Sequence, residues 1–146
     1  MSEEQIAGIM REFAKSLESG DVAKSLSLLT DDAVYDTPYG LYKGKDAIKQ
    51  LLTAMSKNMK DMKITESGNG IIAQGDKAFF EHMLSGMYQG KKYEMLGICA
   101  YDFSGDKIKG MRTVYDRLLT AQQVVKGWPA TSIVNMVVKQ SEKAVK

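Results

Sequence analysis

A chain of 146 residues with 44% hydrophobic and 26% charged residues has the length and composition of a single globular domain. Its formal net charge of +2, with both signs interspersed, excludes a strong bulk attraction to nucleic acid or to an anionic membrane. One Cys and one His exclude an internal disulfide and a His/Cys metal cluster, so we expect neither metal nor cofactor. The acidic N-terminus lacks a signal-peptide pattern and no apolar run could cross a bilayer, which favours a cytoplasmic protein.

The first part of the chain is predicted to be helical, with one interrupting strand. Ser2 and Gln5 form a capping-box pattern, and apolar residues follow them at helical spacing. Gly20 ends this first helix, and Asp21 can cap a second one. The run TDDAVYDTP predicts a short strand that ends at Pro38, and a glycine-containing loop then leads to a third helix.

The second part is rich in β-type residues separated by turn signals. The predicted strands are Met62–Glu66, Gly70–Ala73, Lys77–Tyr88, Lys92–Phe103 and Lys107–Tyr115. The last three are long and joined by tight turns, which predicts an antiparallel meander. Helices followed by such a sheet indicate an α+β fold. We expect a cone in which a curved antiparallel sheet wraps on the N-terminal helices and encloses a pocket.

The end of the chain is predicted to be helical again. A helix follows the strand ending at Tyr115, Trp128-Pro129 breaks it, and a last helix starts near Thr131. Ile133, Met136 and Val137 give this last helix an apolar side. We therefore expect a domain of residues 1–127 and a helical extension of residues 128–146 that packs on the same domain, with Trp128 anchoring the turn.

Three segments carry a resemblance to a known family: TDDAVY at the first strand, YKGKDAI at the start of the third helix, and GDKIKGMRTVYDRL at the last strand. In this order they resemble the SnoaL-like and ketosteroid-isomerase-like proteins of the nuclear transport factor 2-like superfamily. The resemblance covers roughly Glu4 to Gly127 and implies the cone-shaped fold. It implies no single activity, because this fold hosts isomerases, cyclases, dehydratases, hydrolases and binding modules.

The groups that carry catalysis in ketosteroid isomerase are missing from this chain. In an alignment on the DDA motif, the base Asp falls on Thr37, the helix Tyr on Phe13 and the protonated Asp on Cys99. Asp36 is next to Thr37 on the strand and should therefore point away from the cavity. We expect Asp36 not to act as a general base.

His82 and Asp116 remain as candidate catalytic residues. An unperturbed His titrates near neutral pH, and the family's strand parity turns His82 towards the cavity, although a purely structural role is the alternative. Asp116 matches an acid often found in SnoaL-like sequences, and it is equally suited to capping the helix that follows. Cys99 is expected to be an inert wall residue unless His82 lies close to it.

Further residues are expected to line an apolar pocket: Phe13, Tyr35, Thr37, Leu84, Met95, Cys99, Met111, Thr113 and Tyr115. They favour a protein that binds a small, mostly apolar molecule. An enzyme of isomerase, cyclase or lyase type with an unassigned substrate is compatible with the same pocket. The alternative is a non-catalytic dimeric interaction or scaffold protein. Residues expected to face inwards on the strand Lys92–Phe103 are Met95, Gly97 and Cys99. They alternate with Leu96, Ile98 and Ala100, so both faces of the sheet are partly apolar, which predicts a homodimer.

Overall fold

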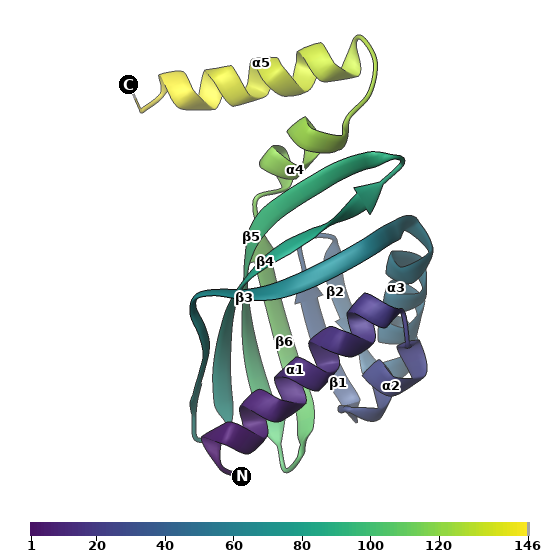
Figure 1. Cartoon of the computed structure of the whole chain (residues 1–146), viewed down its shortest axis with the longest axis vertical. Helices are drawn as coiled ribbons and strands as arrows, with labels where there is room; N and C mark the ends of the chain where they lie inside the picture. Colours follow the sequence, from purple (N-terminus) through teal and green to yellow (C-terminus); the bar gives the residue numbers. More distant parts are fainter. Residues whose placement is uncertain (146) are drawn as a thin grey trace.

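Six strands form one bent sheet, and α1 crosses its concave face (Figure 1). The computed structural model describes residues 1–145. The strands lie in the order β2-β1-β6-β5-β4-β3. Their bounds are β1 (Leu29–Thr37), β2 (Gly40–Lys43), β3 (Met59–Gln74), β4 (Lys77–Tyr88), β5 (Lys91–Ser104) and β6 (Lys107–Tyr115). The predicted α+β fold is confirmed, with one correction: β1 and β6 are parallel, so the sheet is mixed.

Within residues 1–145, five helices accompany the sheet: α1 (Glu3–Ser19), α2 (Val22–Ser27), α3 (Gly44–Asn58), α4 (Arg117–Val124) and α5 (Ala130–Lys143). The predicted capping box is present at α1. The Ser2 hydroxyl accepts from the Gln5 N–H at 3.2 Å, and the Gln5 side chain accepts from the Ser2 N–H at 2.7 Å. Gly20 ends α1 in the left-handed region with a φ of 70°, and the Asp21 carboxylate caps α2. Local sequence signals thus fix where α1 starts and stops and where α2 starts.

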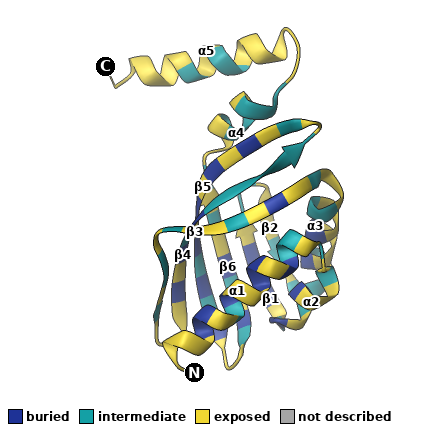
Figure 2. Cartoon of the chain, in the orientation of Figure 1, coloured by how far each residue is buried: buried dark blue, intermediate teal, exposed yellow. Residues whose placement is uncertain are grey.

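The apolar stripe of α1 forms the centre of the core. Ile6, Met10 and Phe13 are at most 1% exposed and face the concave side of the sheet, where Figure 2 shows the buried positions in dark blue. Ile108 and Met111 of β6 belong to the same buried cluster. Phe13 and Met111 were expected to line a pocket, and both are core residues in this fold.

The segment predicted as two short strands is one long strand, β3. Its pairing with β4 shifts register twice, between Lys60 and Lys63 and between Glu66 and Ile71. The glycines of the SGNG run, which resemble a turn in the sequence, have positive φ angles within the second irregular stretch. They bend the strand without ending it. The loop expected after Thr37 is likewise a short hairpin that forms β2.

The C-terminal helix α5 packs against α4 and lies beyond the end of the sheet (Figure 1). Its apolar side is open to solvent in a single chain: Ile133 is 53% and Met136 60% exposed. Trp128, expected to anchor the turn, is 84% exposed and makes no such anchor within the chain. None of the helices in residues 1–145 has the length and hydropathy needed to cross a membrane.

The core role of Phe13 predicts a large stability loss on truncation. Phe13→Ala should lower the free energy of unfolding by about 3–5 kcal/mol, because it leaves a cavity beneath α1. Leu41→Ala is the control, since Leu41 is 54% exposed and its change should stay within about 0.5 kcal/mol. Urea denaturation followed by circular dichroism measures both. Equal, small effects would show that Phe13 is not a core residue.

Candidate functional site

A cavity of about 50 Å³ lies between α1, the end of α3 and the concave face of the sheet. We call it the inner cavity. Six of the predicted site residues line it: Tyr35, His82, Leu84, Cys99, Thr113 and Tyr115. They come from β1, β4, β5 and β6, so the bend of the sheet is what brings them to one space.

His82 lies flat across β5 because its cross-strand partner is Gly97. A Cβ atom at Gly97 would stand 2.7 Å from the His82 Nε2, so any larger residue would displace the ring. The His82 Nδ1 donates a long hydrogen bond of 3.4 Å to the Phe80 carbonyl, which leaves Nε2 as an acceptor. The Phe80 ring is 4.7 Å away between centroids. Burial, only partly offset by the Phe80 carbonyl, lowers the pKa of His82.

A chain of neutral polar groups crosses the inner cavity from β5 to β1. The Cys99 thiol lies 3.1 Å from the Thr113 hydroxyl, and that hydroxyl donates to the Tyr35 oxygen at 3.2 Å. Burial raises the pKa of the Cys99 thiol and of the Tyr35 phenol, so both stay protonated at neutral pH. Cys99 contacts Thr113 rather than His82, and its thiol is therefore not activated as a nucleophile.

The inner cavity carries no formal charge at neutral pH. None of the described residues that line it is Asp, Glu, Lys or Arg. Burial and a hydrogen bond with Tyr39 raise the pKa of Tyr115, and burial raises that of Tyr101. Across residues 1–145, no group of three His, Cys, Asp or Glu side chains is placed to hold a metal ion. The site can therefore donate and accept hydrogen bonds, and its only group that exchanges a proton near neutrality is His82.

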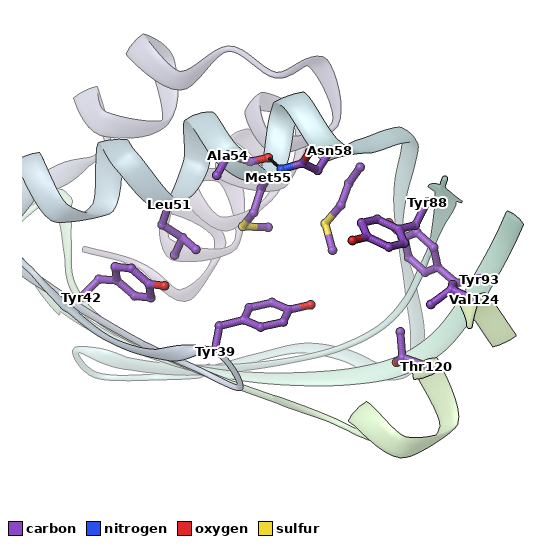
Figure 3. Close-up of a pocket in the computed structure, with 11 residues that line it drawn as sticks. Tyr39, Tyr42, Leu51, Ala54, Met55, Asn58, Tyr88, Tyr93, Thr120 and Val124 are labelled. Carbon is purple, nitrogen blue, oxygen red and sulfur yellow. Dashed lines mark hydrogen bonds between the residues drawn. The ribbon is translucent and has the colours of Figure 1, made fainter. Parts of the chain in front are cut away.

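A larger pocket of about 310 Å³ opens at the wide end of the cone, and we call it the mouth pocket (Figure 3). Leu51, Ala54 and Asn58 of α3 lie on one side of it in Figure 3, opposite tyrosine rings. The tyrosines are Tyr39, Tyr42, Tyr88 and Tyr93, and Thr120 and Val124 of α4 complete the lining. Met55 and Met59 line both the mouth pocket and the inner cavity. These two methionines form the partition between the two spaces.

Two predicted lining residues serve other contacts. The Thr37 hydroxyl accepts from the Tyr39 N–H and donates to the Gly40 carbonyl, both at 3.0 Å, so it stabilises the turn between β1 and β2. Met95 is 1% exposed, and its sulfur accepts from the Thr120 hydroxyl at 3.2 Å. Met95 thereby connects β5 to α4, and neither residue lines the inner cavity.

Asp116 is exposed at the end of β6 and caps α4. Its carboxylate accepts from the Leu119 N–H at 2.9 Å. Of the two roles weighed for this residue, the structure shows the cap, outside both pockets. Asp36 is exposed on the outer face of β1, opposite Leu41 and Arg112 in the neighbouring strands. This position agrees with the expected parity.

Several lining residues were missed in the sequence. Tyr101 is two positions after Cys99 on β5 and shares its face, so strand parity would have found it. Met55 and Met59 fit the apolar stripe of α3 and were interpreted as core, because periodicity does not say where a core ends. The mouth tyrosines lie at strand ends and turns. No periodic signal marks such positions.

The fold is that of the nuclear transport factor 2-like superfamily, and three solved structures illustrate the similarity. A hypothetical protein from Catenulispora acidiphila with a ketosteroid-isomerase-like fold, in complex with trimethylamine, is 17% identical, with a TM-score of 0.74 over 84% of this chain and 94% of its own. A candidate polyketide cyclase from Silicibacter is 18% identical, with a TM-score of 0.74 over 82% and 94%. A nuclear transport factor 2-like protein from Anabaena variabilis is 25% identical, with a TM-score of 0.70 over 77% and 87%.

The sequence profile of the SnoaL-like domain matches residues 10–111. The chain therefore belongs to the SnoaL-like family. No curated protein matches the chain.

The lowered pKa of His82 predicts a specific pH dependence of stability. The unfolded chain binds the proton more tightly than the folded one, so the stability gained from neutral His82 is fully present above the ordinary His pKa of 6.5 and is lost as the pH falls from there towards the lowered pKa. His82 is the only His in the chain. Between about pH 7.5 and about pH 5.5, the wild type should lose more stability than His82→Phe, which keeps a ring over Gly97.

Thermal unfolding at the two pH values measures this difference. Asp116→Asn is the matched control and should keep the wild-type pH dependence, because this cap lies outside the cavity. If His82→Phe shows the same pH dependence as the wild type, the imidazole is not held neutral by burial.

Proposed function

We propose that this protein binds a small, uncharged, mostly apolar molecule that enters the cone through the mouth pocket. The observation that carries the proposal is an open, apolar pocket leading to a buried group of neutral polar side chains. Ligand sites of small-molecule-binding proteins have the same composition: an apolar wall with a few convergent polar groups. Similarity to a candidate polyketide cyclase supports the same class of ligand.

The lining of the mouth pocket favours a ligand with a ring system. A volume of about 310 Å³ is at the low end of the range for ligand pockets, which begins near about 300 Å³. Tyr42 and Tyr88 offer flat faces on which a ring can pack, and Leu51 adds an aliphatic surface. Met55 and Met59 can adapt to different outlines. A charged ligand would lose its hydration here without gaining an ionic partner.

His82 is the group that we assign to any proton transfer in this site. Its Nε2 is left as an acceptor by the hydrogen bond at Nδ1, and His82 is the only lining side chain that titrates near neutral pH. We do not assign such a role to Asp116, since its carboxylate is occupied as a helix cap. An activity of isomerase, cyclase or lyase type would therefore depend on His82.

Binding in the mouth pocket can be tested with N-phenyl-1-naphthylamine, an uncharged aromatic probe that fluoresces in apolar surroundings. The wild type should enhance its fluorescence in a saturable manner. Ala54→Trp, which places a large ring in the mouth pocket, should weaken binding by about 10-fold or more, as expected when a ligand loses most of its contact area.

Ile133→Ser is the matched control for the probe. It removes an exposed apolar residue of α5, a helix whose described residues do not line the pocket, and should leave the affinity unchanged. If Ala54→Trp binds the probe as the wild type does, or if Ile133→Ser abolishes binding, the probe binds elsewhere and the proposed function is wrong.

A second proposal concerns assembly: the outer face of the sheet pairs with a second copy of this chain. Ile98 and Val114 are cross-strand neighbours there and are 43% and 63% exposed, and Phe79 beside them is 56% exposed. Glu81 and Arg112 lie on the same face in register with Ile98 and Ala100, so the face carries both signs of charge next to its apolar centre. A self-complementary face of this kind suits a two-fold interface.

The assembly proposal predicts the effect of one buried charge. Val114→Asp should convert a dimer to a monomer, because the carboxylate would be desolvated at the centre of the interface. Val145→Asp is the control, since Val145 is 86% exposed at the end of the chain. Multi-angle light scattering at micromolar concentration gives the mass of each. A monomeric wild type would contradict the proposal and would leave ligand binding as a function of the single chain.

A further inference from the structure

The geometry points to a two-part ligand: an apolar ring body that fills the mouth pocket, and one short, uncharged hydrogen-bond-accepting oxygen that passes between Met55 and Met59 into the inner cavity. This inference rests on the proposed function and names the class of ligand for the same site. Ketones, esters and ethers attached to an aromatic or alicyclic ring belong to this class.

The two volumes set the size of each part. The inner cavity measures about 50 Å³, and a water molecule's share of liquid volume is about 30 Å³. It therefore accepts a functional group and no ring. The mouth pocket, at about 310 Å³, is the space for the ring body. Ala14 of α1 lines the inner cavity, whereas the larger Phe13 beside it belongs to the core and is not part of the lining.

The two methionines connect the parts. Met55 comes from the last turn of α3 and Met59 from the first residue of β3, and each lines both spaces. Both are partly buried rather than locked in the core. An unbranched thioether side chain changes rotamer at low cost. The partition can therefore open for a slim group and close around it.

The hydrogen-bond direction in the inner cavity decides the chemistry of the oxygen. Thr113 donates its hydroxyl proton to the Tyr35 oxygen, so the Tyr35 O–H proton itself remains available for another acceptor. Among the described residues no acceptor receives it. Cys99 then donates to Thr113, which orders the chain of donors from β5 to β1. A ligand oxygen with a lone pair completes this chain, whereas an apolar group would leave the Tyr35 proton unpaired.

The test compares two uncharged ligands with one ring body: 2-acetylnaphthalene, which has a ketone oxygen, and naphthalene, which has no head group. Each is measured by displacement of N-phenyl-1-naphthylamine from the wild type, Tyr35→Phe and Ala14→Leu. Tyr35→Phe should weaken binding of the ketone by about 3- to 10-fold, the effect of one lost hydrogen bond. It should leave the affinity for naphthalene unchanged. Ala14→Leu fills the inner cavity while keeping the Tyr35 hydroxyl, and it should give the same pattern.

Tyr88→Phe is the matched control, because it removes a tyrosine hydroxyl from the mouth pocket and should not discriminate between the ligands. If both ligands displace the probe and Tyr35→Phe and Ala14→Leu affect them equally, the inner cavity takes no head group. This result would overturn the inference and leave the proposed function intact. If neither ligand nor the probe binds the wild type, the proposed function fails and this inference fails with it.

Discussion

The packing of α1 into the concave face of the sheet is the constraint on which both the core and the site depend. A bent sheet exposes apolar residues on its inner side, and α1 covers them with a stripe of its own. The stripe starts with large side chains, Ile6, Met10 and Phe13, which fill the narrow part of the cone. Ala14 and Leu17 follow, and they line a cavity instead of closing it. The order of residue sizes along one helix thus divides the interior into a core and a cavity.

The second constraint is that the polar side chains of the inner cavity are neutral and must find hydrogen-bond partners there. Gly97 makes room for the His82 ring, and the Phe80 carbonyl holds one of its nitrogens. Thr113 joins Cys99 to Tyr35 by short contacts across two strand pairs. Burial then keeps each of these groups in its neutral form. The result is an interior that can recognise an uncharged oxygen, which suits the fold of a SnoaL-like protein while using groups other than those of ketosteroid isomerase.

Periodicity and turn signals in the sequence predicted much of this architecture. The bounds of β4 and β6 agree with the prediction, since tight turns with glycine flank strands of alternating residues. Parity also placed His82 on the cavity side and Asp36 on the outer side. The sequence could not show that Phe13 turns into the core, because helical periodicity places it on the apolar stripe of α1 without showing where the core ends and the cavity begins. Nor could it show that Thr37 serves a hairpin, that β1 lies parallel to β6, or that Met55 and Met59 divide two pockets. These features depend on contacts between segments far apart in the chain.

The central claim is that the interior next to His82 is uncharged and receives the ligand. Because His82 is the only His in the chain, its imidazole gives a single set of signals in a carbon- and nitrogen-detected nuclear magnetic resonance titration. The account predicts a His82 pKa below the ordinary value of 6.5. It also predicts a further decrease of this pKa when 2-acetylnaphthalene is bound, because the ligand excludes water from the imidazole. A pKa at or above 6.5 that the ligand does not change would contradict the account.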